Sequence, residues 1–315
     1  MRPLLFAAMA ALVLAPFGVG RLYSAYYLNL LTWILIFALF AASLDLALGY
    51  GGLVSFGHAG FFGAGAYGVA LALRHLSPSL WLALLVGVAA AAGLAVVVGY
   101  FAVHSRGVYM AMLTFAFAQL LYEVAIKWVA VTGGSDGLPG AGRPRVGLGA
   151  IALDLSDKRH MYWLVLALVL LGYLAARRVV ASPFGHALIA VRESEERARA
   201  IGIDVTRHRR VALVFSGALA GLAGGLFAVF QNFVSPELLF FGLSGEVVVI
   251  ALLGGLGTLY GSLVGAAIAI GLREVLSSYT DNWLVFLGAL YVVSVMCFPQ
   301  GLVRLGEGLF RPRRA

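Results

Sequence analysis

Long apolar stretches separated by short polar segments limit what this chain can fold into. A bilayer-spanning helix takes roughly 20 apolar residues, so ten such helices would use about 200 positions. In this chain of 315 residues, 62% are apolar and 11% are charged, whereas about 25% are charged in an average soluble domain. These proportions exclude a soluble enzyme with a single anchor. We expect an all-α, polytopic membrane protein whose residues 1–315 form one transmembrane domain.

Ten apolar runs are long enough, or nearly so, to span a membrane, and the eighth and ninth are short. They lie at about 4–20, 26–48, 53–73, 80–103, 109–131, 161–180, 211–234, 246–258, 261–276 and 283–299. Arg2 and the small residues of the first run also match a secretory signal peptide, which would leave nine helices. Glycine supplies 40 residues. In an apolar chain this abundance favours close helix packing and broken helices.

Lysine and arginine are unevenly distributed among the polar segments, which predicts the orientation. With both termini in the cytoplasm, the inner segments hold 14 of these residues and the outer segments hold six. Short cytoplasmic loops carry an excess of Lys and Arg, so this arrangement is favoured. Residues 132–160 then form an external loop and residues 181–210 a cytoplasmic loop. Because topology accounts for the basic excess, a surface for nucleic acid is not needed.

The cytoplasmic loop predicts a helix with signals at both ends. Ser182 can cap it, Pro183 suits its first turn, and Gly202 suits its end. Its charges and apolar residues allow two interpretations: a solvated connector with internal ion pairs, or a docking helix that enters a groove on a cytoplasmic partner. The candidate docking residues are Arg192, Glu193, Glu195, Glu196, Arg197, Ala198, Arg199 and Gly202.

Two glycine-rich segments, at 49–60 and 253–261, share the pattern Gly-Gly-Leu-x-Ser/Thr. Dense glycine disfavours continuous helix, and irregular backbone at membrane depth needs protein or a watery cavity beside it. We therefore expect these segments to line or hinge a solute path, with tight helix packing as the alternative. The candidate path residues are Gly51, Gly52, Ser55, Gly57, His58, Gly254, Gly255, Gly257 and Thr258. His58 considered alone is more typical of a structural hydrogen bond.

Charges inside the apolar runs are few. Glu123 and Lys127 have the i,i+4 spacing of an ion pair within one helix face, so we expect an intramembrane pair whose charges cancel. Asp45 can cap a helix or reach toward the membrane surface. This scarcity argues against a proton-coupled pump.

Motifs for catalysis and cofactors are absent from the sequence. It contains no P-loop, no His-Glu-x-x-His zinc motif and no Gly-x-Ser-x-Gly elbow. Cys297 is the only cysteine, which excludes a disulfide framework and a thiolate metal cluster. We expect no enzyme activity, no metal site and no cofactor in this chain.

Five segments in order resemble the membrane permeases of branched-chain amino-acid ABC importers, of the LivM type. The resemblance covers nearly the whole chain. The segments are GYGGLVSFGHAGFFGAGAY at 49–67, TFAFAQLLYE at 114–123, TGGSDGLPG at 132–140, SPFGHALIAVRESEERARAIGI at 182–203 and GEVVVIALLGGLGTLYG at 245–261. In the cytoplasmic loop, Glu196, Ala198 and Gly202 match the Glu-Ala-Ala-x-x-x-Gly pattern of importer permeases, whereas Arg197 departs from it.

The resemblance implies a multi-pass subunit of a bacterial or archaeal inner membrane. It implies a second, LivH-like permease, two cytoplasmic ATPases that bind the ATP, and an extracytoplasmic binding protein as partners. The docking residues of the cytoplasmic helix would then couple to the ATPases. The implied solutes are leucine, isoleucine and valine. Alternatives are another small neutral solute, such as urea, a short amide or another amino acid, and a stand-alone channel or ion-coupled carrier.

Overall fold

The computed structural model describes most of the chain between residues 25 and 301. The described residues are 25–105, 107–140, 145–148, 151–280, 282, 285, 286, 288, 289, 292, 296 and 301. The apolar run expected at 4–20 and most of the run at 283–299 lie outside this part of the chain.

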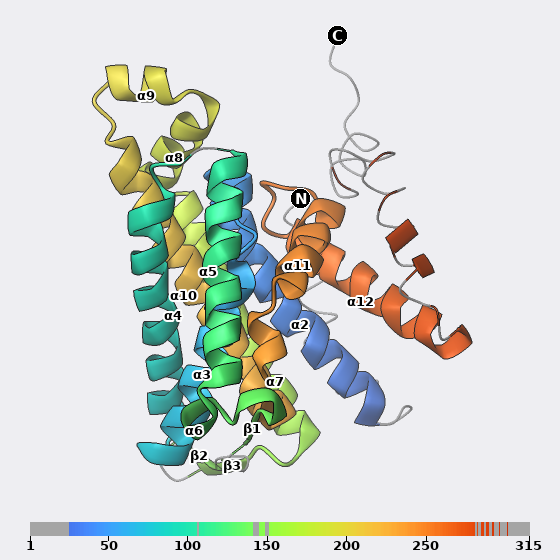
Figure 1. Cartoon of the computed structure of the whole chain (residues 1–315). Helices are drawn as coiled ribbons and strands as arrows, with labels where there is room; N and C mark the ends of the chain where they lie inside the picture. Colours follow the sequence, from blue (N-terminus) through green and yellow to red (C-terminus); the bar gives the residue numbers. More distant parts are fainter. Residues whose placement is uncertain are drawn as a thin grey trace.

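Helices make up nearly all of the described structure (Figure 1). The α-helices are α2 (Ala25–Asp45), α3 (His58–His75), α4 (Leu80–Ala102), α5 (Val108–Lys127), α6 (Val129–Thr132), α7 (Lys158–Val180), α8 (Pro183–Glu193), α9 (Glu195–Ala200), α10 (Val205–Gln231), α11 (Phe241–Gly254) and α12 (Gly261–Tyr279). A π-helix, η1 (Leu46–Tyr50), extends α2, and two 3-10 turns occur, η2 (Gly134–Asp136) and η3 (Pro236–Leu239). The expectation of an all-α membrane protein is confirmed.

Among the described residues, four short strands lie in the polar connections. β1 (Leu138–Pro139) pairs antiparallel with β4 (Phe233–Val234), so Leu138 lies opposite Val234. β2 (Arg145–Leu148) and β3 (Ile151–Asp154) form a second antiparallel pair. In Figure 1 the strands and α6 lie at the opposite end of the molecule from α8 and α9. The segments 132–160 and 181–210 are therefore at opposite ends of the helix bundle.

Six helices of the described residues are long and apolar enough to cross a membrane, so the expected number of ten is too high. They are Tyr26–Tyr50, Leu80–Ala102, Val108–Lys127, Lys158–Val180, Val205–Gln231 and Gly261–Tyr279. The glycine-rich segments explain two of the differences. The run at 53–73 becomes helical only at His58 and continues to Arg74 and His75. The run at 246–258 ends its helix at Gly254, which leaves α11 with 14 residues.

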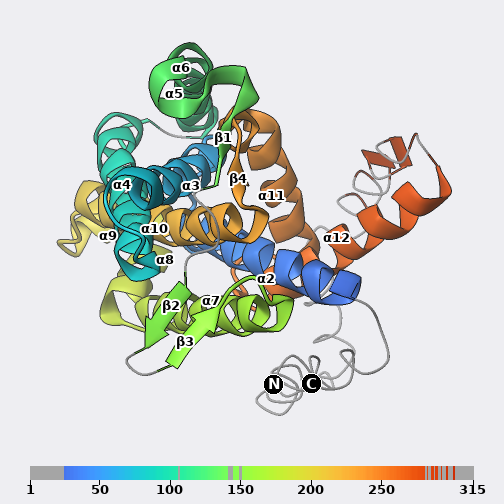
Figure 2. The same cartoon turned by 90° about the horizontal axis from the view of Figure 1, so that it is seen from below.

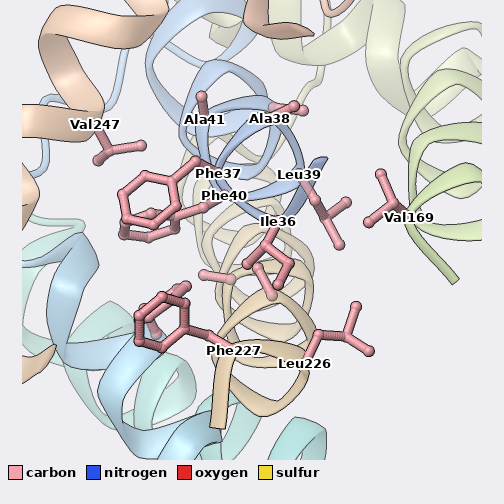
Figure 3. Close-up of a cluster of buried hydrophobic side chains, with 14 of the residues drawn as sticks. Ile36, Phe37, Ala38, Leu39, Phe40, Ala41, Val169, Leu226, Phe227 and Val247 are labelled. Carbon is pink, nitrogen blue, oxygen red and sulfur yellow. The ribbon is translucent and has the colours of Figure 1, made fainter. Parts of the chain in front are cut away.

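The centre of the bundle is formed by α2 and α10. In the most apolar stretch of each, 83% of α2 with η1 and 72% of α10 are buried, against 28 to 39% for the other four long helices. Figure 2 shows α2, α3, α4, α10 and α11 close together around this centre. Phe37, Phe62 and Phe227 pack at centroid distances of 5.6 to 6.2 Å, and Figure 3 shows part of this core.

Close backbone approach between helices depends on glycine. A Cβ added at Gly68 of α3 would lie 2.9 Å from the Cα of Gly87 in α4, a separation that real Cβ atoms do not show. A Cβ at Gly224 of α10 would overlap the backbone carbonyl of Phe62. Small residues at these positions let α3, α4 and α10 pack through their backbones.

The segment 181–210, expected as a cytoplasmic loop, contains two short helices before α10 begins, which corrects the expectation of one. Ser182 accepts a hydrogen bond from the amide of Gly185 and Pro183 begins α8, as the sequence predicts. Ser194 interrupts the helix because its backbone is extended (φ −161°, ψ 110°). Its hydroxyl accepts a hydrogen bond from the amide of Arg197, which makes Ser194 the N-cap of α9.

Candidate functional site

The first glycine-rich segment breaks the path of the chain between α2 and α3. η1 ends at Tyr50, residues 51–57 are not helical, and α3 begins at His58. Gly52 has φ +66°, a conformation that favours glycine. The amide of Phe56 donates to Thr114 Oγ1 at 3.1 Å, which ties the segment to α5. The predicted break in the helix is confirmed.

The second glycine-rich segment separates α11 from α12 in a similar way. Gly255 and Gly257 have φ +106° and +76°, and Leu259 has φ +39°. Thr258 Oγ1 donates to the carbonyl of Gly255 at 2.6 Å, so the threonine stabilises its own turn. Gly254 and Gly261 pack backbone against backbone at the two ends of the loop.

Asp45, the last residue of α2, brings the two segments together. Its Oδ1 accepts a hydrogen bond from the Gly257 amide at 2.6 Å, and its Oδ2 accepts one from the Leu259 amide at 2.9 Å. The side chain is 1% exposed, so these amides replace the water that a buried carboxylate loses. The sequence left open whether Asp45 caps a helix or reaches the surface. It caps the other glycine-rich segment, 212 residues away.

Nine residues were expected along a solute path, and the structure buries most of them. Gly51, Ser55, Gly57, His58, Gly254, Gly255 and Thr258 are buried, Gly257 is half-buried and Gly52 is exposed. A Cβ at Gly49 would lie 2.6 Å from the amide nitrogen of Gly257, so the two segments are in direct contact. In this conformation the segments are packed against each other and against neighbouring helices.

His58 joins three helices through buried hydrogen bonds. Its Nε2 lies 3.2 Å from Ser43 Oγ in α2 and 3.1 Å from Ser216 Oγ in α10. Both hydroxyls donate to backbone carbonyls, so we assign the proton to Nε2, which donates to them. The ring also stacks on Phe40 at 5.9 Å. This geometry is that of a structural histidine in helix packing.

The helix α8 contacts the first glycine-rich segment directly. Arg192 donates from Nη1 to the carbonyl of Gly49. A Cβ at Gly52 would lie 3.0 Å from Arg192 Cγ, and a Cβ at Gly51 would lie 3.5 Å from Leu188 Cδ1. One residue of the docking set is therefore in contact with the residues of the expected path.

Comparison with known proteins identifies the family that this sequence matches. The branched-chain amino acid transport system permease component family matches residues 26–295. The chain belongs to this permease family. The high-affinity branched-chain amino acid transport system permease protein LivM of Salmonella typhimurium is 32% identical over 94% of this chain and 74% of its own length. LivM of Escherichia coli is 30% identical over the same shares. No solved structure matches the chain.

The permease also has relatives that align with about half of it. The permease protein LivH of the high-affinity branched-chain amino acid transport system of Escherichia coli is 28% identical over 48% of each chain. The autoinducer 2 import system permease protein LsrC of Klebsiella pneumoniae is 35% identical over 49% of this chain and 45% of its own. Permeases named for different solutes therefore share parts of this sequence.

In the permease, the charges of α9 divide into an internal pair and an exposed group. Glu195 pairs with Arg209 of α10 and lies 4.0 Å from Arg199. Ala198 is buried against Val191 and Val205, which fixes α9 on α8 and α10. The remaining docking residues of this region, Glu193, Glu196, Arg197 and Gly202, are exposed.

Two further ion pairs of the described residues lie on α5 and between α11 and α12. Lys127 Nζ is 3.7 Å from Glu123 Oε2 on α5, and both side chains are at least half exposed. Sequence reasoning missed the second pair, in which Arg273 Nη1 of α12 is 3.4 Å from Glu246 Oε1 of α11. Because these residues are 27 positions apart on different helices, no local spacing indicated the pair. Among the described residues, no group of three or more His, Cys, Asp or Glu could hold a metal ion.

Proposed function

We propose that this chain is the membrane-spanning permease subunit of an ABC importer that moves leucine, isoleucine and valine into the cell. The observation that carries the proposal is the similarity over 94% of the chain to two LivM permeases of branched-chain amino-acid transport systems. In the part of the chain that the structure describes, Glu123 pairs with Lys127 and Glu246 pairs with Arg273, so the walls formed by α5, α11 and α12 carry charges of both signs. Such walls suit a molecule without net charge.

The proposed complex contains a second, LivH-like permease, two cytoplasmic ATPases that bind ATP, and an extracytoplasmic binding protein. The partial similarity to LivH supports a related partner permease. The exposed charges of α9 and its neighbours, next to α8, supply a surface for the ATPases. The complex would lie in a bacterial or archaeal inner membrane with both termini in the cytoplasm, as the distribution of Lys and Arg favours.

A second solute class is supported by the LsrC relatives, which are permeases of an autoinducer 2 import system. Their similarity covers about half of this chain. A small neutral solute other than a branched-chain amino acid is therefore the alternative, and direct uptake distinguishes the two.

Reconstitution of the whole complex in lipid vesicles tests the proposal. Radiolabelled leucine should accumulate with ATP and the binding protein, and it should not accumulate when either is omitted. A protonophore at constant ATP should leave uptake unchanged. Collapse of uptake with the protonophore would contradict an ATP-driven importer, whereas uptake of urea in place of leucine would contradict only the solute.

A further inference from the structure

The loop between α11 and α12 depends on Asp45 for its position. Leu259 has φ +39°, a left-handed conformation that residues with a side chain disfavour. Its amide and that of Gly257 both donate to the Asp45 carboxylate. The loop is therefore held in a disfavoured backbone conformation by hydrogen bonds to the Asp45 side chain of α2.

The π-helix η1 connects this carboxylate to α8. It begins immediately after Asp45, and the carbonyl of Gly49 within it accepts the hydrogen bond from Arg192. π-Helices are rare in proteins, and those that occur are frequently at functional sites. Gly49, which contacts α8, is therefore only four positions along the chain from Asp45, which contacts the loop at 255–260.

We propose that Asp45 and Arg192 are positioning residues that make α8, η1 and the loop at 255–260 one mechanical unit. A displacement of α8 would then move both glycine-rich segments together. The inference rests on the proposed importer function, because it assigns ATPase motion as the source of that displacement. It adds Asp45 to the residues with a coupling role, and it gives Arg192, already a candidate docking residue, a contact with the first glycine-rich segment.

The conversion of ATP hydrolysis into transport tests this unit in the reconstituted complex. We expect Asp45→Asn and Arg192→Gln to assemble with their partners yet lower the leucine imported per ATP hydrolysed at least tenfold. The double variant should lose no more than the worse single variant, because both residues act through one unit. Arg192→Lys, which retains a cation, should recover part of the ratio. Arg178→Gln makes the same change at an exposed arginine of α7 and should match the unsubstituted complex.

Amide hydrogen exchange measures the link between Arg192, Asp45 and the loop at 255–260 independently of transport. In the purified complex, Asp45→Asn and Arg192→Gln should both speed exchange in a peptide covering residues 255–260, whereas Arg178→Gln should not. Unchanged exchange in Arg192→Gln, or losses of the import ratio that add in the double variant, would overturn the unit. If the unsubstituted complex lacks ATP-dependent uptake, the proposed function fails, and the exchange result still decides whether the link exists.

Discussion

At the residue scale, glycine has two physical roles in this permease, and its neighbours decide which role applies. Gly224 of α10 permits close packing, because a Cβ there would overlap the backbone of Phe62. Gly255 and Gly257 instead supply positive φ angles that end α11. Gly93 has neither constraint, since a Cβ there would meet nothing within 4 Å. Glycine therefore tolerates substitution to a different degree at each of these positions.

This difference predicts opposite results for one chemical change. Gly224→Ala should lower the free energy of unfolding by about 1–3 kcal/mol, because the added methyl overpacks the α3–α10 contact. Gly93→Ala, also within a helix, should be neutral or stabilising by up to about 1 kcal/mol. Thermal unfolding of the two purified variants in detergent measures both effects. Equal melting temperatures would show that the α3–α10 contact is looser than the structure has it.

At the element scale, the glycine-rich segments interrupt the helices where two parts of the bundle meet. We expect Gly52→Val and Gly255→Val to reduce leucine uptake much more than the amount of assembled complex, because each forces a branched side chain onto a positive φ angle. Gly271→Val in α12 is the matched control, since a Cβ there meets nothing within 4 Å. If both loop variants take up leucine at the rate of the unsubstituted complex, the solute path lies elsewhere.

The division of the segment 181–210 into α8 and α9 separates two tasks. α8 contacts the glycine-rich segment through Arg192, whereas α9 presents exposed charges. We expect Glu196→Lys to leave the permease inserted and folded but to abolish binding-protein-stimulated ATP hydrolysis, because it reverses a charge on the docking surface. Glu237→Lys should keep that stimulation, because exposed Glu237 lies in η3 just after β4, the strand that pairs with β1 at the opposite end of the bundle. Normal stimulation in Glu196→Lys would assign α9 the role of a connector.

At the scale of the whole molecule, the sequence predicts local properties well and long-range contacts poorly. Apolar length predicted the long helices, and glycine density predicted the breaks at 51–57 and after Gly254. The residue types Ser182 and Pro183 predicted the start of α8. The number of spans was overestimated because apolar runs do not show where a glycine-rich stretch ends a helix. Ser194 was missed as a break because charge pattern alone continues through it. The link from Asp45 to Gly257 joins residues 212 positions apart, and local periodicity contains no information on that distance.

Orientation in the membrane is the property of the whole molecule that a direct measurement can decide. The unequal distribution of Lys and Arg predicts that residues 181–210 are cytoplasmic and 132–160 external, and the structure places these segments at opposite ends. In a Cys297→Ser background, Ser135→Cys should react with an impermeant thiol reagent in intact cells. Arg199→Cys should react only after the membrane is opened. Both side chains are exposed, and Arg199 is preferable to Ser194 because Ser194 caps α9. Labelling of both from the same side would contradict the topology, and an exchange of sides would invert it.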